Sequence, residues 1–278
     1  MILISLLIAL AIERVIDKNP RWQIETWAKQ YWQCVQSKLA RPRHTSDTTI
    51  WALILLPAIV LALAEYYLLG HFLTFIEQTA MVLLCIGCPA LRQTYKCFLR
   101  AAKRGDEQAC ALYTEQLGHT GIPESAGQVP KTFGQHLIWL NYQYYAAVIL
   151  WFIAFGAPGA LFYCTVRTIA TMSLPRRQRL SAAHMLYALD FIPVRITALG
   201  MLLVGDFSQA LPVWLRYCPD MRVPASIILA DVAFAAETRQ PQTEDLMDEP
   251  SVLVKLAKRN ITFLIIMTAI LTIVGAVA

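Results

Sequence analysis

Residues 50–69 read IWALILLPAIVLALAEYYLL, an apolar run in which Glu65 is the only charged residue. About twenty helical residues, rising about 1.5 Å each, cross the hydrocarbon core of a bilayer, so this run predicts a transmembrane helix. The whole 278-residue chain has the same character, with 57% apolar and only 15% charged residues. This balance excludes disorder and most water-soluble folds. We therefore interpret the chain as an all-α integral membrane protein.

Working outward from this run, the sequence predicts two transmembrane hairpins and a terminal span. Residues 50–91 form the first hairpin, which turns at Gly70 and His71. Residues 137–174 form the second hairpin, because the sequence Gly156-Ala157-Pro158-Gly159 is a strong turn signal between two apolar runs. Residues 261–278 close the chain as a clean apolar span.

The N-terminal apolar stretch, residues 1–12, is shorter than a span. It has neither a positive leader nor a small-residue cleavage site, and Glu13 and Arg14 follow at once, so we expect a retained, partly inserted helix. Glu13 and Asp17 would share a face of this helix at i, i+4 spacing. Such a carboxylate pair could bind a cation or activate a nucleophile, or it could simply be a solvated helix end.

Residues 185–205 have the length of a span, but Asp190, Pro193 and Arg195 lie near their middle. Charges are costly at membrane depth, and proline removes a helical hydrogen bond, so we expect a broken or re-entrant helix rather than a plain crossing. Asp190 and Arg195 could pair across the kink. That pair would be either a structural lock or part of a site that binds an anion.

Loop charges indicate the orientation, because Lys and Arg accumulate on the cytoplasmic side of membrane proteins. Of the 24 basic residues, 22 lie outside the apolar runs; segments 13–49, 92–136, 175–184 and 206–260 hold 7, 6, 3 and 6 of them. Neither hairpin turn has any. We therefore expect a multi-pass membrane protein, with these four segments in the cytoplasm and the C-terminus on the opposite side of the membrane.

The cytoplasmic segments should be partly helical. We expect an interfacial helix within residues 20–40 because four aromatic residues lie there among basic ones, and a helical hairpin over residues 90–118 that turns at 103–106. Residues 223–237 also read as a helix, whereas the acidic stretch 237–250 reads as a solvated loop. We find no internal repeat. We expect a single domain over 1–278. Its segments are an N-terminal part with partly inserted and interfacial helices (1–49), a hairpin (50–91), a cytoplasmic helical segment (92–136), a second hairpin (137–174), a broken helix (185–205), a cytoplasmic segment (206–260) and a terminal span (261–278).

Signatures of soluble enzymes are missing from the sequence. It has no Gly-rich phosphate loop, no nucleophile elbow and no His-Glu-x-x-His motif, so we assign no catalytic residue and no metal site. The net charge of +5 is the bias expected of a membrane protein, and we expect no nucleic-acid partner. Cys85 and Cys88 resemble a redox or zinc half-site, but without a second pair we favour thiols packed between helices.

Polar residues at membrane depth remain as candidates for function. Ionisable residues in apolar spans normally face the interior of the helix bundle or a water-filled cavity. Glu65 and Glu77 flank the first hairpin turn and could simply reach water, whereas Arg167 lies well inside its run. The complete set of candidate ligand-binding residues is Glu13, Arg14, Asp17, Asn141, Arg167, Asp190 and Arg195.

The chain resembles the AmpE family of bacterial inner-membrane proteins, within the wider CobD/CbiB family of adenosylcobinamide-phosphate synthases. The matching stretches run in family order over nearly the whole chain: Leu10–Trp22, Arg104–Asp106, Ile138–Tyr145, Gly156–Ala160, Leu189–Leu199 and Gly205–Trp214. The resemblance implies a role in β-lactamase induction, a functional link to the AmpD amidase pathway, and a nucleotide as the candidate cofactor.

Two departures from the synthase pattern affect the chemistry. Where synthases carry Glu-Asn-x-x-Asp and Asn-Thr-x-Asp motifs, this chain has Trp139–Gln143 and Arg167–Ala170. Carboxylates that could hold Mg²⁺ against a phosphate are therefore absent at both places. Arg167 instead adds a positive charge that could recognise an anionic group.

We therefore expect an inner-membrane sensor or signalling modulator of β-lactamase induction and peptidoglycan recycling that binds an anionic, nucleotide-like or cell-wall-derived small molecule. The alternative is an ATP-dependent amide-forming ligase like the synthases. A transporter is the least favoured reading, because the complete spans are few and no inverted repeat is visible.

Overall fold

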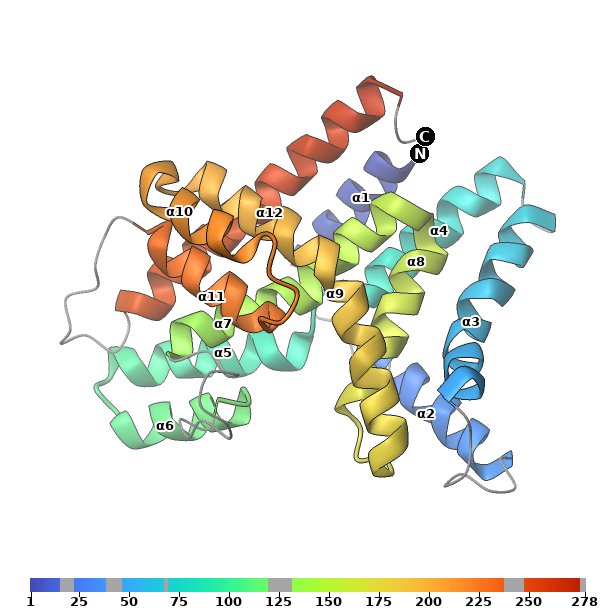
Figure 1. The fold of residues 1–278 in the computed structure, drawn as a ribbon, viewed down its shortest axis with the longest axis horizontal. Coiled ribbons are helices and arrows are strands. Elements are labelled where there is room, and N and C mark those ends of the chain that lie inside the picture. Colours follow the sequence, from blue (N-terminus) through green and yellow to red (C-terminus); the bar gives the residue numbers. More distant parts are fainter. Residues whose placement is uncertain (16–22, 39–46, 68–69, 120–131, 238–247, 276–278) are drawn as a thin grey trace. The chain divides into compact units, whose positions relative to one another are not determined.

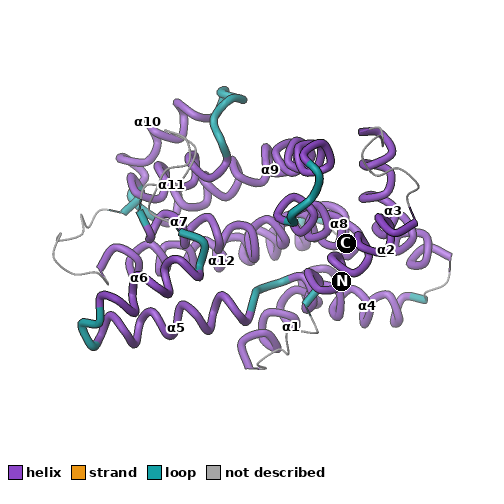
Figure 2. Tube along the Cα trace, turned by 90° about the horizontal axis from the view of Figure 1, so that it is seen from below, coloured by secondary structure: helices purple, strands orange, loops and turns teal. Residues whose placement is uncertain are grey.

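The computed structural model describes residues 1–15, 23–38, 47–67, 70–119, 132–237 and 248–275. Within these ranges every regular element is a helix, as Figures 1 and 2 show, so the all-α prediction is confirmed. The helices of the first half are α1 Ile2–Val15, α2 Ile24–Lys38, α3 Asp47–Tyr67, α4 His71–Cys85, α5 Pro89–Lys103 and α6 Glu107–Gln116. Those of the second half are α7 Phe133–Asn141, the π-helix η2 Tyr142–Ala146, α8 Ala147–Thr171, α9 Arg176–Val204, α10 Phe207–Tyr217, α11 Ala225–Ala235 and α12 Asp248–Ile273.

Four helical stretches among the described residues are long and apolar enough to cross a membrane: 47–67, 133–171, 176–204 and 249–273. A fifth is formed if α4 and α5, which are bent by 42° at a short break, count as one span. The expected cytoplasmic helices are also helical, as α2, α5 with α6, and α11. The chain is therefore a helical, multi-pass membrane protein.

The second predicted hairpin turns at Gly156, inside α8. The backbone of Gly156 leaves the helical region at φ 67° and ψ −156°. A Cβ atom on Gly159 would lie 2.5 Å from the carbonyl oxygen of Trp151, although eight residues of straight helix rise about 12 Å. The chain therefore folds back on itself here, as the turn signal predicted.

Two elements differ from the sequence-based expectation. α9 is one continuous helix of 29 residues that contains Pro193, where we expected a broken or re-entrant helix. Pro193 removes one backbone donor, the helical partner of the Leu189 carbonyl, and membrane helices tolerate such a single loss. α12 begins at Asp248, well before the apolar run at 261, because the preceding polar residues continue the helix.

The chain divides into two compact units, each assembled from separate segments. Unit 1 comprises Met1–Gly87, Ala147–Asp190 and Thr268–Ala278, and unit 2 comprises Cys88–Ala146 and Phe191–Met267. We describe each unit by itself; the single domain over 1–278 stays a prediction.

In unit 1, α8 is the central helix, and α1, α2, α3 and α4 all pack against it. The sequence of α2 favours a helix because its apolar residues lie on one face. Ile24, Ala28 and Trp32 are spaced four residues apart and are buried. Trp32 belongs to a core that also contains Ile50, Ile54, Val166, Ile169 and Ala182. This packing places α2 beside the polar face of α8.

In unit 2, α5 and α6 form the predicted helical hairpin, and α7 and α10 both pack against α11. The hairpin turns at Gly105, whose φ of 69° favours glycine, and the Asp106 side chain caps α6 by accepting a hydrogen bond from the Ala109 amide. Phe98, Ala101 and Cys110 form its buried core. Unit 2 is therefore a helical assembly with its own core.

Candidate functional site

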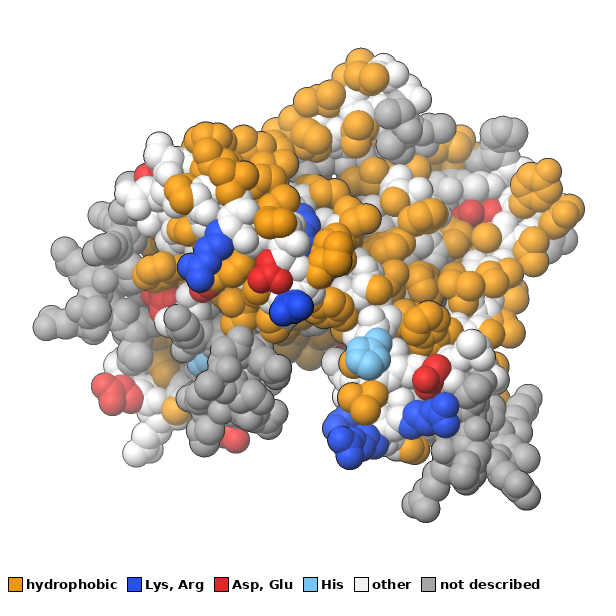
Figure 3. Space-filling view, viewed as in Figure 1, with side chains coloured by type: hydrophobic (Ala, Val, Ile, Leu, Met, Phe, Trp, Pro, Cys, Tyr) orange, Lys and Arg blue, Asp and Glu red, His pale blue; other side chains and the backbone are white. Residues whose placement is uncertain are grey.

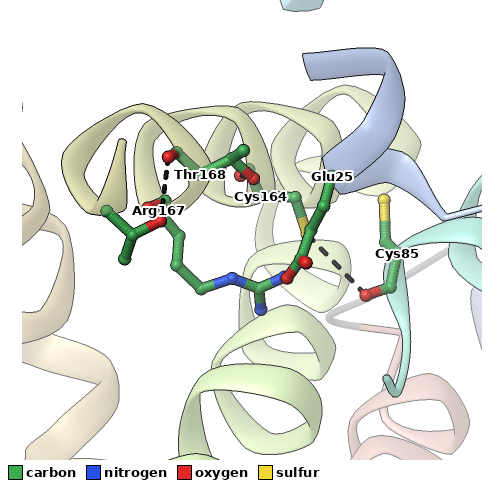
Figure 4. Close-up of polar contacts among 6 residues, drawn as sticks. Glu25, Cys85, Cys164, Arg167 and Thr168 are labelled. Carbon is green, nitrogen blue, oxygen red and sulfur yellow. Dashed lines mark hydrogen bonds and ion pairs between the residues drawn. The ribbon is translucent and has the colours of Figure 1, made fainter. Parts of the chain in front are cut away.

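Arg167, on α8, is a deeply buried charge of unit 1. Its side chain is only 3% exposed, and its Nη2 lies 3.2 Å from Oε1 of Glu25, whose side chain is 20% exposed. Figure 4 shows the guanidinium group directed at this carboxylate. Glu25 lies in the first turn of α2, which packs on α8. A buried charge needs a partner, and Glu25 supplies one from a segment far away in the sequence.

A buried acid, Asp190, is bound by Tyr163, which precedes Arg167 on α8. Tyr163, one helical turn before Arg167, is fully buried and donates a 3.0 Å hydrogen bond from its hydroxyl to Oδ1 of Asp190. Tyr163 and Arg167 are four residues apart on α8 and therefore lie on the same face of the helix. We call Glu25, Tyr163, Arg167 and Asp190 the Arg167 cluster. It combines two carboxylates, one guanidinium cation and one phenol among apolar helices. Another anionic group could therefore replace the Glu25 carboxylate at Arg167.

The hydroxyl groups around the cluster are bound to the backbone of α8. Thr168 Oγ1 donates to the Cys164 carbonyl at 2.7 Å, and Cys164 Sγ contacts the Cys85 carbonyl at 3.8 Å (Figure 4). Cys85 and Cys164 are both buried. Cys85 therefore packs against α8 at the end of α4, which fits the interpretation of a thiol between helices.

The N-terminal candidates separate from one another. Glu13 is 8% exposed and lies on the inward face of α1 with Ser5, Leu6 and Ala9. α1 packs on α4 and α8, whereas Arg14 is exposed. Asp17 lies outside the described residues. Glu13 is thus a buried acid of unit 1, and its role in ligand binding stays a prediction.

Arg195 belongs to unit 2, where it closes the C-terminal end of α10. Its Nε donates to the Cys218 carbonyl at 2.9 Å, and its Nη2 donates to the Asp220 carbonyl at 2.7 Å. The guanidinium also lies 3.7 Å from the ring centre of Phe191. Cations commonly bind the free carbonyl groups at a helix C-terminus. Arg195 therefore has a structural role within unit 2, and its role in ligand binding stays a prediction.

Asn141, also in unit 2, is the last residue of α7 and directly precedes η2. Single π-helical turns inside α-helices occur frequently at functional sites. This one covers the Tyr-Gln-Tyr-Tyr run, whose Tyr145 hydroxyl accepts a 3.3 Å hydrogen bond from Arg92. The motif at Asn141 therefore has an unusual backbone, although the residues beside it are amides and phenols rather than acids.

Sequence reasoning missed Glu25 and Tyr163. Glu25 was hidden in a segment that reads as an interfacial helix, and only its position in the first turn of α2 distinguishes it. Tyr163 carried a usable signal, because it lies four residues before Arg167 and therefore on the same helix face. Glu65 and Glu77 interact across α3 and α4 and lie outside the Arg167 cluster.

Two of the comparisons with known proteins cover essentially the whole chain. A family model described as "Regulatory signalling modulator protein AmpE" matches residues 1–278. Protein AmpE of Shigella flexneri is 27% identical and covers 99% of both chains. Cobalamin biosynthesis protein CobD of Chromobacterium violaceum is 25% identical over 78% of this chain and 74% of the relative, and CobD of Stutzerimonas stutzeri is 25% identical over 63% and 59%. No solved structure gives a significant match.

Proposed function

Since this chain belongs to the AmpE family of regulatory signalling modulator proteins, we propose that it is a bacterial inner-membrane modulator of β-lactamase induction and peptidoglycan-recycling signalling. We further propose that the Arg167 cluster senses an anionic small molecule. The observation that carries the second proposal is the buried pair of Arg167 and Glu25, which joins a central span to a helix outside the spans.

The charge arrangement suggests how such a ligand would bind. Arg167 already holds a carboxylate, so a ligand carboxylate or phosphate offers it the same kind of acceptor. An arginine fork can bind two oxygens of a planar or tetrahedral anion, whereas one contact of 3.2 Å joins it to Glu25. The ligand would therefore replace Glu25 without leaving the buried guanidinium uncompensated.

Replacement of Glu25 would change how α2 is held. α2 packs on α8 through Ile24, Ala28 and Trp32, and the Glu25 contact is the charged part of that attachment. A ligand shifts a two-state equilibrium only through its different affinity for the two states. While α2 is docked, the ligand must compete with Glu25 for Arg167. Once α2 is released, the ligand has no competitor, so its affinity for the released state is higher. The movement of α2 would then carry the signal.

The experiment uses a strain with an inducible β-lactamase in which variants replace the chromosomal copy. We expect Arg167→Gln to abolish the effect of the protein on induction and Glu25→Gln to fix the signalling state, because ligand and carboxylate no longer compete. Arg179→Gln, which removes an exposed cation on α9, is the control and should behave as wild type. If the double variant Glu25→Gln/Arg167→Gln signals normally, the pair is structural and the ligand proposal is wrong.

The CobD relatives support one alternative, an ATP-dependent amide-forming ligase. Against it, the positions that correspond to the synthase acids are occupied by residues such as Gln143 and Ala170, which cannot hold Mg²⁺ as carboxylates do. We therefore expect the purified protein to form no amide bond with ATP and Mg²⁺. Detectable ATP-dependent amide formation would favour the ligase over the sensor.

A further inference from the structure

A cavity of about 450 Å³ lies in unit 1 between the first turns of α3 and α9. Figure 3 shows basic, acidic and histidine side chains gathered where these two helices begin, at the lower end of α9 and α3 in the view of Figure 1. The cavity is lined by Asp47, Trp51, Arg176, Arg177, Leu180, Ser181 and His184. It is separate from the Arg167 cluster, with which it shares no residue.

The cavity is electropositive. Arg177 Nε lies 3.3 Å from Oδ1 of Asp47, but both side chains are more than half exposed, so this pair is weak. Among the residues that the structure describes, no other polar group binds the guanidinium groups of Arg176 or Arg177. Two arginines and one aspartate leave an excess positive charge, and the N-termini of α3 and α9 add partial positive charges.

The floor of the cavity is formed by a hydrogen bond between the two helices. Trp51 Nε1 donates to Ser181 Oγ at 2.8 Å, and Ser181 is only 5% exposed. A serine hydroxyl that accepts one hydrogen bond can still donate its own proton. The cavity thus offers a buried donor beneath two arginines, while Trp51 and Leu180 provide apolar surface.

The position of the cavity along α3 identifies its surroundings. α3 is a candidate membrane span that begins at Asp47, and Trp51 is one turn inside it. Tryptophan is enriched at the level of lipid headgroups. Beyond Trp51 the exposed face of α3 is apolar, with Leu55, Leu56, Ile59, Val60 and Leu63. We therefore expect the basic groups to lie at headgroup depth and the apolar surface to continue at acyl-chain depth.

We propose that this cavity binds the headgroup phosphate of an anionic phospholipid. Arg176, Arg177 and Ser181 donate to the phosphate oxygens, and the acyl chains follow the apolar face of α3. This proposal does not depend on the function of the Arg167 cluster. It predicts selectivity for anionic over zwitterionic lipids, because a choline group would add a positive charge to an electropositive cavity.

The test is native mass spectrometry of the full chain in a non-ionic detergent, titrated with dihexanoyl-phosphatidylglycerol, dihexanoyl-phosphatidylcholine or glycerol 3-phosphate. We expect phosphatidylglycerol to bind at least about tenfold more tightly than either other probe. Equal binding of the two lipids would overturn the proposal. Glycerol 3-phosphate that binds as tightly as phosphatidylglycerol would also overturn it, because the site would then be one for a soluble anion.

Variants locate the binding to the cavity. Arg176→Gln/Arg177→Gln should weaken phosphatidylglycerol binding about tenfold, whereas Arg179→Gln should not, because Arg179 is exposed on another face of α9. Asp47→Asn should strengthen binding, since it removes the negative charge and releases Arg177; misfolding could not produce this gain. An equal loss in the Arg179 variant, or weaker binding in the Asp47 variant, would refute the assignment.

Discussion

The contact between Arg167 and Glu25 predicts a measurable coupling energy. At their separation of 3.2 Å, Coulomb's law gives about 5 kcal/mol with an effective dielectric constant of about 20. Desolvation offsets part of this attraction, and the 20% exposure of the Glu25 side chain reduces it further. Because removing one member of a buried pair typically costs about 3–5 kcal/mol, we expect about 3 kcal/mol for each of Glu25→Gln and Arg167→Gln.

The double variant should be no less stable than either single variant. Removing both charges abolishes the attraction but also the desolvation cost, so the coupling energy should be at least about 3 kcal/mol. The assay is reversible unfolding of the purified protein by titration of a denaturing detergent, followed by far-UV circular dichroism. Arg14→Gln serves as the matched control, because it removes an exposed positive charge from the same unit.

The reasoning would be refuted by additive losses. If the double variant loses the sum of the two single losses, the two side chains do not stabilise each other, and the contact is no basis for a competing ligand. Unchanged stability in both single variants would also refute it. Arg167 is so deeply buried that loss of its charged partner should lower the stability of the protein.

Three further predictions follow from the fold. Gly156→Ala should lower stability by about 1–3 kcal/mol in thermal unfolding, because its backbone conformation is essentially restricted to glycine; an unchanged midpoint would contradict the hairpin turn. Arg195→Lys should cost about 2 kcal/mol and speed proteolysis of unit 2, because a lysine cannot reproduce the fork that binds the carbonyl groups after α10; equal protease resistance would contradict this role. On a cysteine-free background, a single cysteine at the exposed Gly70 should react with an impermeant thiol reagent from the periplasm while one at the exposed Glu107 is protected; the opposite pattern would invert the topology.

The sequence by itself was sufficient for the helical membrane class, the principal spans and the turn at Gly156. These features are local, because the transfer of a helix into a bilayer depends mainly on the composition of about twenty consecutive residues. The same locality explains the error at α9. Pro193 and the charges around it predicted a break, but α9 continues through the proline, and Asp190 and Arg195 find partners distant in the sequence, the Tyr163 hydroxyl and the Cys218 carbonyl.

The partners of the buried charges were decided only by the tertiary structure. Arg167 was recognisable in the sequence as a charge within an apolar run. Its partner Glu25 lies 142 residues away in the sequence, and Asp190 joins the cluster by accepting a hydrogen bond from Tyr163. The cavity between α3 and α9 likewise joins Asp47 to Arg177, which are 130 residues apart. Which residues meet depends on how each helix is rotated about its axis and which neighbour it packs against. A long apolar run carries little of that information, because nearly all of its faces look alike.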